Sequence, residues 1–111
     1  MSTWTSSHVR IDRRSLDLHR LIADKIRQQP DLFALPVENV KRWKMKYKVA
    51  PVCFDEWAEI LDQGMERALA VATEESDRAT ELRQSSPFSG ILSPQERWRF
   101  LKEWNEANSN T

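Results

Sequence analysis

Glycine is scarce in this chain of 111 residues, which contains only two. Small β-sandwiches and β-barrels depend on many tight turns, and glycine supplies the backbone conformations that such turns need. The scarcity of glycine therefore argues against both folds. It also argues against a phosphate-binding loop, in which glycines let the backbone approach the ligand closely.

Cysteine and histidine are nearly absent as well. Cys53 is the only cysteine, so the chain cannot form an internal disulfide, which suits a reducing compartment. The two histidines, His8 and His19, do not stand at metal-ligand spacing from Cys53 or from each other. We therefore expect no bound metal and no cofactor.

Long apolar runs are missing too. The longest covers residues 68–72, far fewer than a membrane span requires. Residues 1–10 are rich in serine and threonine and contain no apolar segment of the kind found in secretory signals. The expectation is a cytoplasmic protein that does not enter a membrane.

The chain has no net charge, with 17 Lys and Arg against 17 Asp and Glu, but the charges are unevenly distributed. Residues 1–50 carry 11 basic and 5 acidic residues, a net charge of +6, and residues 51–111 carry 6 and 12, a net charge of −6. Two interpretations follow. Either the first half offers a basic surface to an anionic partner, or the two halves attract each other.

Apolar residues at spacings of three and four predict the first two helices. The first begins at Ser15 and ends at Pro30, which cannot continue a helix. Pro36 suits the first turn of the next helix, where its missing N–H is not needed. The inward positions of the two helices are Leu18, Leu21, Ile22, Ile26, Val37, Val40, Trp43 and Tyr47.

Three more helices are predicted after Pro51. Asp55 is the expected N-cap of a third helix, and Gly64 separates it from a fourth. A short fifth helix around residues 75–83 is supported by the spacing of four between Glu74 and Arg78. The inward residues of the third and fourth helices are Trp57, Ile60, Leu61, Met65, Ala68, Leu69 and Ala72.

The last predicted helix has a clear start signal. Ser93 as N-cap, Pro94 at the first position and Glu96 at the third make a capping box. Residues 1–14 show no helical pattern, and the alternation of Val9 and Ile11 with charged residues favours a short strand or an extended arm. Residues 105–111 are expected to form a polar tail. The sequence thus predicts an all-α protein, a single compact domain of five or six short helices over residues 15–104. The last helix is expected to bury Trp98, Leu101 and Trp104.

The most basic segment of the chain, residues 41–48, combines five cations with two aromatic residues. A row of cations at helical spacing can neutralise phosphates and release counterions, which gives salt-sensitive binding of nucleic acid. The alternative is a solvated helix face whose aromatic residues belong to the core. The helix start near Pro36 is similar to a recognition helix, but the link from Gln28 to Pro36 is longer than the turn of a helix-turn-helix. The candidate nucleic-acid-binding residues are Lys41, Arg42, Lys44, Lys46 and Lys48, and Arg10, Arg13, Arg14 and Arg20 would extend their field if they lay on the same face.

Four carboxylates follow at spacings of four, three and four. Paired carboxylates can bind metals or transfer protons, but only where they point inward and lose their solvation. Because Trp57, Ile60 and Leu61 take the inward side, we interpret the carboxylates as a solvated acidic face that can pair with the lysine row. These residues are Asp55, Glu59, Asp62 and Glu66.

Residues 84–92 form a predicted loop with three serines and three large apolar residues. The serines belong to no Gly-x-Ser-x-Gly elbow and have no base at a recognisable position, so we expect no enzyme. The apolar residues either fold back onto the core or form a docking surface, and the arginines on each side either pin the loop or hold a partner's carboxylate. The candidate partner-binding residues are Arg83, Phe88, Ile91, Leu92 and Arg97.

Several short segments resemble a group of small bacterial proteins related to toxin–antitoxin modules. They are residues 82–88 (LRQSSPF), 90–92 (GIL), 96–98 (ERW), 19–20 (HR) and 42–43 (RW). The resemblance extends over residues 15–104 and implies an antitoxin-like or regulatory role, but it assigns no site residue.

Two hypotheses for function follow. The preferred one is a non-enzymatic helical interaction module, antitoxin-like or regulatory, that binds a partner protein and occludes its active or nucleic-acid-binding surface. The alternative is a nucleic-acid-binding transcriptional regulator that uses residues 41–48. Both are compatible with a homo-oligomer.

Overall fold

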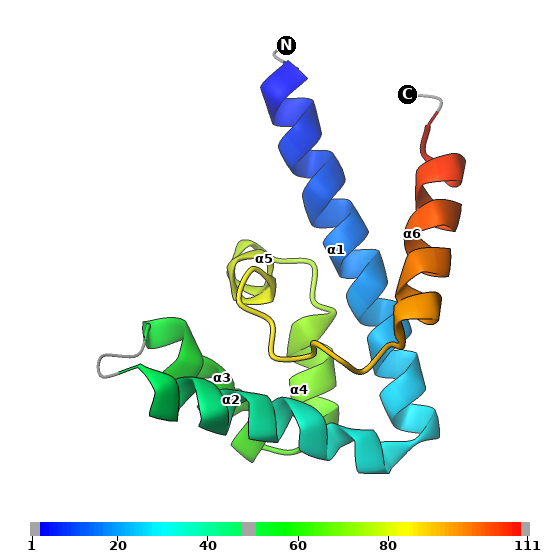
Figure 1. The fold of residues 1–111 in the computed structure, drawn as a ribbon. Helices are drawn as coiled ribbons and strands as arrows, with labels where there is room; N and C mark the ends of the chain where they lie inside the picture. Colours follow the sequence, from blue (N-terminus) through cyan, green and yellow to red (C-terminus); the bar gives the residue numbers. More distant parts are fainter. Residues whose placement is uncertain (1–2, 48–50, 110–111) are drawn as a thin grey trace.

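The computed structural model describes residues 3–47 and 51–109, which form six α-helices and one short 3₁₀ helix (Figure 1). These residues contain no strand, so the prediction of an all-α protein is confirmed. The elements are α1 (Thr3–Gln28), η1 (Pro30–Phe33), α2 (Ala34–Lys46), α3 (Val52–Asp62), α4 (Met65–Ala72), α5 (Asp77–Arg83) and α6 (Pro94–Ala107).

Helix α1 is much longer than the sequence predicts. It begins at Thr3, so the predicted extended arm is wrong for the part of residues 1–14 that the structure describes. The segment has no glycine or proline to stop a helix that propagates from the apolar positions further along. Contacts with α6 also hold this end: Arg10 Nη1 donates to the Asn108 carbonyl at 2.6 Å, and its guanidinium lies 4.8 Å from the centre of the Trp104 ring.

Two prolines direct the chain from α1 into α2, as predicted. Helix α1 ends at Gln28, Pro30 opens η1, and Pro36 stands in the first turn of α2. Because η1 lies between them, α1 and α2 are not joined by the tight turn of a helix-turn-helix. Helix α2 instead runs across the C-terminal end of α1 and packs against α3 (Figure 1).

The start of α3 differs from the prediction. Its N-cap is Pro51, and Asp55 lies in the first turn. Pro51 has the extended backbone of an N-cap, with φ −55° and ψ 146°, and the helix continues from Val52. In the first turn the Asp55 carboxylate still faces the positive end of the helix dipole.

The core forms where α1, α2, α3 and α4 meet and is closed by the loop after α5. Trp57 is its largest fully buried side chain, and its indole N–H donates to the Leu82 carbonyl at 2.9 Å. The Trp57 ring meets Phe88 edge-on at 5.6 Å between centroids. Gly64 separates α3 from α4 with a φ of +107°, a conformation that favours glycine. The other core residues are Ile22, Ala23, Ile26, Val40, Leu61, Ala68, Leu69, Val71, Ala72, Leu82 and Ile91.

Helix α6 begins as predicted but buries less than predicted. The capping box of Ser93 and Glu96 is present, and Trp104 is buried with its N–H donating to Asp17 Oδ2 at 2.9 Å. Trp98 is 63% exposed, so its predicted burial is wrong. Lys102 Nζ lies 5.1 Å from the centre of its ring. The helix continues to Ala107, so residues 105–107 are not part of a tail.

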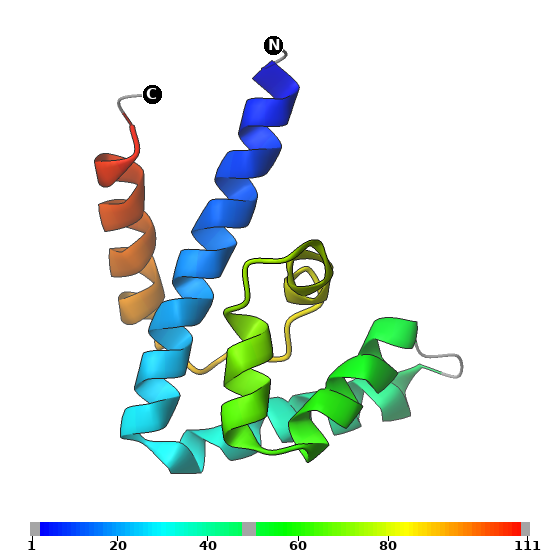
Figure 2. The ribbon, with the colours of Figure 1, turned by 180° about the vertical axis from the view of Figure 1, so that it is seen from behind.

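Lys25 ties the start of α6 to α1. Its Nζ donates to Glu96 Oε1 at 2.5 Å and to the Ile91 carbonyl at 2.8 Å. The hydrogen bond from Lys25, followed by that from the backbone of Ser93, lowers the pKa of Glu96 to about 2. From this point α6 runs antiparallel to α1, and the two chain ends lie at the same end of the molecule (Figures 1 and 2).

Candidate functional site

The loop between α5 and α6 folds back onto the core. Phe88 and Ile91 are each 2% exposed, and Leu92 is half-buried against the core. Asn39 of α2 holds the loop backbone, because its Nδ2 donates to the carbonyls of Pro87 at 2.8 Å and of Ser89 at 3.1 Å. Of the two interpretations of these apolar residues, the docking surface is therefore wrong for Phe88 and Ile91.

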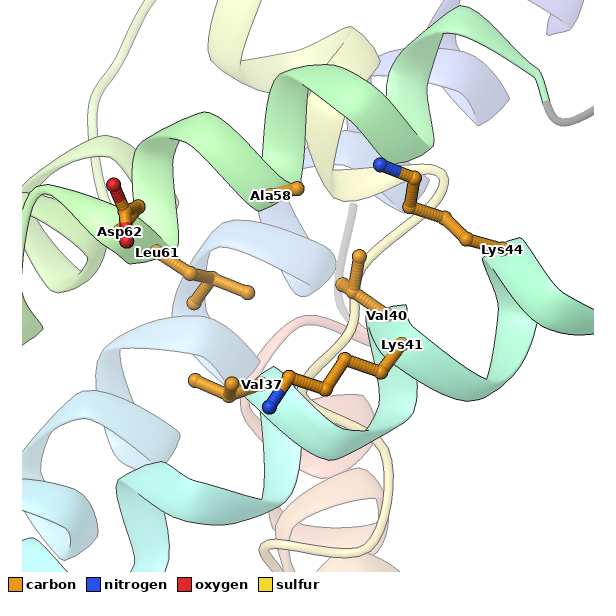
Figure 3. Close-up of a pocket in the computed structure, with 7 residues that line it drawn as sticks. All are labelled: Val37, Val40, Lys41, Lys44, Ala58, Leu61 and Asp62. Atoms are coloured by element: carbon orange, nitrogen blue, oxygen red, sulfur yellow. The ribbon is translucent and has the colours of Figure 1, made fainter.

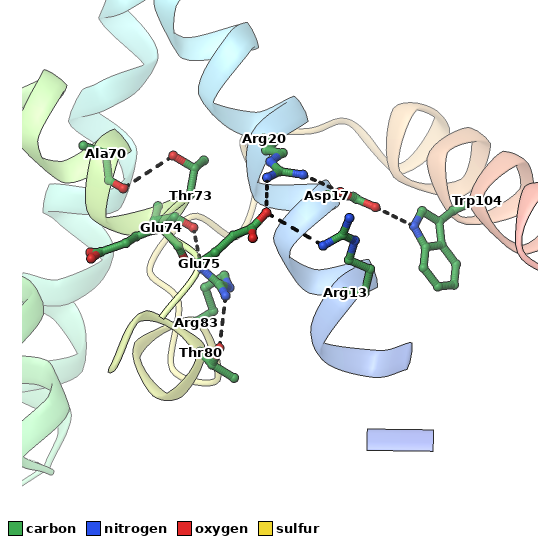
Figure 4. A network of polar contacts seen from close by, with 11 residues as sticks. Arg13, Asp17, Arg20, Ala70, Thr73, Glu74, Glu75, Thr80, Arg83 and Trp104 are labelled. Carbon is green, nitrogen blue, oxygen red and sulfur yellow. Dashed lines mark hydrogen bonds and ion pairs between the residues drawn. The ribbon is translucent and has the colours of Figure 1, made fainter. Parts of the chain in front are cut away.

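Arg83 is also buried, at 6% exposure, and pins the chain before α5. Its Nη1 donates to the carbonyls of Ala72 at 3.1 Å and Glu74 at 2.9 Å, and its Nη2 donates to Thr80 Oγ1 at 3.2 Å (Figure 4). Arg83 therefore holds the turn between α4 and α5 and not the loop that it was predicted to pin. A surface role in binding a partner is also wrong for Arg83, because the side chain is buried. Its Nε–H is buried without a hydrogen-bond partner among the residues that the structure describes. Burial lowers the pKa of the Arg83 guanidinium.

A pocket of about 380 Å³ lies between α1, the loop and α6. Three arginines from three helices line it: Arg14 of α1, Arg83 at the end of α5 and Arg97 of α6. We call it the cationic pocket, because no acidic side chain of the described residues lines it. Arg14 is half-buried and Arg97 is exposed, and neither forms an ion pair within the described part of the chain. The remaining lining residues are Ile11, Ser15, Leu18, His19, Ile22, Gln84, Ser86, Phe88, Ser89 and Leu101.

A hydrogen-bonded chain runs along one wall of the cationic pocket. His19 Nδ1 lies 2.7 Å from the Ser15 carbonyl oxygen, and His19 Nε2 lies 2.7 Å from Ser86 Oγ. Ser86 Oγ also accepts the backbone N–H of Phe88 at 3.2 Å. Burial lowers the pKa of His19, and the positive charge of Arg83 lowers it further. The histidine is therefore neutral at pH 7.

Two lysines of the predicted nucleic-acid-binding set are engaged by acidic neighbours. Lys44 Nζ lies 3.0 Å from Asp55 Oδ1 of α3, and Lys41 Nζ lies 3.8 Å from Glu38 Oε1. The acidic row of α3 thus pairs with the lysine row at Asp55, as the sequence interpretation allowed. Internal pairing of this kind leaves less positive charge free for an anionic partner.

The other cations of this set are spread around the end of α2. Arg42 donates to Asn39 Oδ1, and Lys46 Nζ lies 5.8 Å from the centre of the Tyr47 ring. Tyr47 is half exposed, so its predicted inward position is only partly correct. Lys48 lies outside the described residues.

Most of the basic residues of α1 are also held within the molecule. Glu75 Oε1 accepts from Arg20 Nη2 at 2.8 Å and lies 3.8 Å from Arg13 Nη1 (Figure 4). Arg10 is bound at the carbonyl of Asn108. These three arginines therefore do not extend the field of α2, and Arg14 lies instead in the cationic pocket. The predicted pair of Glu74 with Arg78 is replaced by one between Arg78 and Glu56 of α3.

A second groove, of about 330 Å³, lies between α2 and α3 (Figure 3). Val37, Val40, Ala58 and Leu61 form its apolar surface, while Lys41, Lys44 and Asp62 surround it. Its charges are of both signs, and Lys44 is already bound by Asp55. The groove therefore favours neither an anion nor a cation as clearly as the cationic pocket favours an anion.

The described residues hold no group of three or more His, Cys, Asp or Glu side chains that could bind a metal ion. None of the described helices is long and apolar enough to cross a membrane. No protein-family model matches the chain, and neither the curated proteins nor the solved structures provide a match.

Sequence reasoning named two arginines of the pocket, Arg83 and Arg97, as candidate partner-binding residues, but it missed the pairing of His19 with Ser86. The two residues are 67 positions apart, so no local motif connects them. One signal was present: His19 lies on the same face of the first helix as Ile22 and Ile26, where a polar residue needs a partner.

Proposed function

We propose that this protein is a helical protein-interaction module that binds an acidic, partly apolar segment of a partner protein in the cationic pocket. The observation that supports the proposal is the lining of the pocket by Arg14 and Arg97, which form no ion pair within the described part of the chain, without an acidic side chain among the described residues. Guanidinium groups bind carboxylates through two parallel hydrogen bonds, which makes arginine the preferred residue for such contacts.

The apolar part of the pocket supports a ligand that is more than a simple anion. Ile11 lines the pocket and is 53% exposed, so it would lose contact with water when a partner binds. Leu18 and Leu101 contribute further apolar surface from α1 and α6. A segment that combines carboxylates with apolar side chains would satisfy both kinds of surface.

Occlusion is the mechanism that suits a preformed pocket of this kind. The helices that form it are held together by the hydrogen bond between Trp104 and Asp17 and by the capping contacts of Lys25 and Glu96. A partner bound there would be covered by a surface that needs little rearrangement, which lowers the cost of binding. The resemblance to toxin–antitoxin modules supports an antitoxin-like role for such a complex.

The first experiment is gentle purification of the tagged protein from its source cells, followed by native mass spectrometry. A stoichiometric partner would then be titrated against the wild type, Arg97→Glu and Arg99→Glu. Both arginines are exposed on α6, but only Arg97 lines the cationic pocket. We expect Arg97→Glu to weaken binding at least about tenfold, a loss of roughly 1.4 kcal/mol, and Arg99→Glu to change it little.

Two results would overturn the proposal. One is equal affinity of the partner for both charge-reversal variants. The other is co-purifying nucleic acid, identified by a raised 260/280 nm absorbance ratio, that disappears in Lys44→Glu but not in Arg97→Glu. The second result would favour the regulator that uses the basic segment 41–48.

A further inference from the structure

The serines of the loop were not expected to react, because the sequence places no base beside them. The fold supplies one, because α1 brings His19 to within 2.7 Å of Ser86 at the wall of the cationic pocket. We propose that Ser86 is a nucleophile activated by His19, and that it is acylated by carboxylic esters that carry a negative charge. This activity goes beyond the proposed binding of a partner and uses the same pocket.

The hydrogen bonds fix the positions of the protons. A carbonyl oxygen can only accept, so His19 Nδ1 carries the proton that it donates to Ser15 at 2.7 Å. In the neutral ring Nε2 is then bare and accepts the hydroxyl proton of Ser86. A nucleophile bound to a base, with the base oriented by a third group, is the arrangement that activates serine in acyl transfer.

The surroundings keep His19 able to accept a proton. It is 4% exposed, and the charged groups that line the pocket around it are Arg83 of α5, Arg14 of α1 and Arg97 of α6. Burial of the ring and the positive charge of Arg83 lower the pKa of His19 and so disfavour a second proton before the reaction. Ser86 is half-buried and is one of the residues that line the cationic pocket, where a ligand can enter.

The reaction follows from these positions. Ser86 Oγ attacks the ester carbonyl carbon and passes its proton to His19 Nε2. The bond to the leaving oxygen breaks, and that oxygen takes the proton from His19. Water then attacks the acyl-serine and gives a proton to His19, and the bond to Ser86 breaks as Ser86 recovers that proton. The products are a carboxylic acid and an alcohol, and nothing is oxidised or reduced.

The arginines determine the class of ester. Arg14 and Arg97 are free of ion pairs in the described residues, so they can bind a carboxylate on the ester and stabilise the negative oxygen of the tetrahedral intermediate. An ester with a carboxylate should therefore react faster than the same ester without one. Suitable probes are 4-acetoxy-3-nitrobenzoate and its neutral counterpart, 2-nitrophenyl acetate.

The test measures nitrophenol release and acetylation of the isolated full-length protein. We expect the wild type to release one equivalent in a rapid phase, to carry an acetyl group on Ser86 by peptide mass spectrometry, and to prefer the charged probe about tenfold or more, which corresponds to roughly 1.4 kcal/mol. Ser86→Ala should lose the rapid phase and the acetyl group. The matched control is Ser85→Ala, a neighbouring half-buried serine that does not line the cationic pocket and should react like the wild type.

His19 is tested separately from folding. His19→Gln should lower the rate of acylation by about 10² or more, with the helical circular dichroism checked in the same sample. The wild-type rate should also rise with pH to a plateau, with a midpoint below the usual histidine pKa of 6.5. Acetylation that is equal in the wild type and Ser86→Ala, or that occurs only on lysines, would overturn the proposal. Esterase activity with no partner complex would overturn only the proposed binding function.

Discussion

At the scale of single residues, His19 connects more parts of the molecule than any sequence pattern suggests. It is bound to Ser15 within α1 and to Ser86 in the loop, and it meets the ring of Phe88 edge-on at 6.1 Å between centroids. The neutral form makes these contacts in the folded state. The effect of protonating His19 on stability therefore reports on the contacts that hold the loop against α1.

The lowered pKa of His19 predicts that the protein loses stability as the pH falls below 6.5. Above pH 6.5, the usual histidine pKa, His19 is neutral in both the folded and the unfolded state. Between 6.5 and its lowered folded-state pKa only the unfolded state takes up the proton, so stability falls with decreasing pH. The loss is about 1.4 kcal/mol for each unit of difference between the two pKa values.

Urea unfolding followed by tryptophan fluorescence between pH 7.5 and 5 measures this effect. The free energy of unfolding should decrease toward pH 5 in the wild type. It should depend much less on pH in His19→Gln, because that variant lacks the imidazole, and Glu96, with a pKa of about 2, stays ionised over this range. A wild-type protein whose stability does not change over this interval would contradict the prediction.

At the scale of the helices, the capping box of α6 carries a prediction about stability. Ser93 Oγ accepts the backbone N–H of Glu96 at 3.1 Å, and Glu96 Oε1 accepts the N–H of Ser93 at 2.8 Å. Ser93→Ala should lower the free energy of unfolding by about 1 kcal/mol, because one N–H at the helix start loses its partner. Ser89→Ala, at an exposed position of the same loop, is the control and should cost much less. Equal costs would show that the cap contributes nothing specific.

The helices show which signals in the sequence could be read. Prolines and the capping box are local, and the end of α1 at Gln28 and the start of α6 at Pro94 were predicted from them. The start of α1 at Thr3 was not predicted, because its residues have no apolar periodicity and are held by contacts with α6. The exposure of Trp98 was also missed, because helical spacing alone does not show which face of a helix packs against a neighbouring helix.

The candidate site was less predictable than the helices, because its parts come from distant positions. Arg97 could be named from its place beside the loop, but its neighbours Arg14 and His19 come from α1. Arg83 shows the limit most clearly: its charge suggested a surface residue, yet its Nη groups are used up by the carbonyls and hydroxyl of nearby turns. Only the packing of α5 against α4 decides between these roles.

At the scale of the whole molecule, the uneven distribution of charge is partly an internal attraction. Five ion pairs of the described residues join a cation of the first half to a carboxylate of the second. The arrangement explains how a chain with +6 and −6 in its two halves packs into one domain. These pairs support the interpretation that the two halves of the chain attract each other. Arg14 and Arg97 form no such pair among the described residues and remain available to an anionic partner.

These pairs predict that salt weakens the fold. Raising NaCl from about 0.01 M to about 0.15 M shortens the Debye length from roughly 30 Å to roughly 8 Å, so exposed pairs between the halves are screened. We expect the free energy of unfolding in urea to decrease over this range.

The variant Glu75→Gln tests which ion pairs are responsible. It should lower the free energy of unfolding at low salt by up to about 1 kcal/mol. It should also make that free energy depend less on salt, because Glu75 pairs with Arg13 and Arg20. Glu81→Gln is the control, since Glu81 is exposed on α5 and forms no ion pair within the described part of the chain. Stability that rises with salt in the wild type would mean that repulsion within each half outweighs the attraction between them.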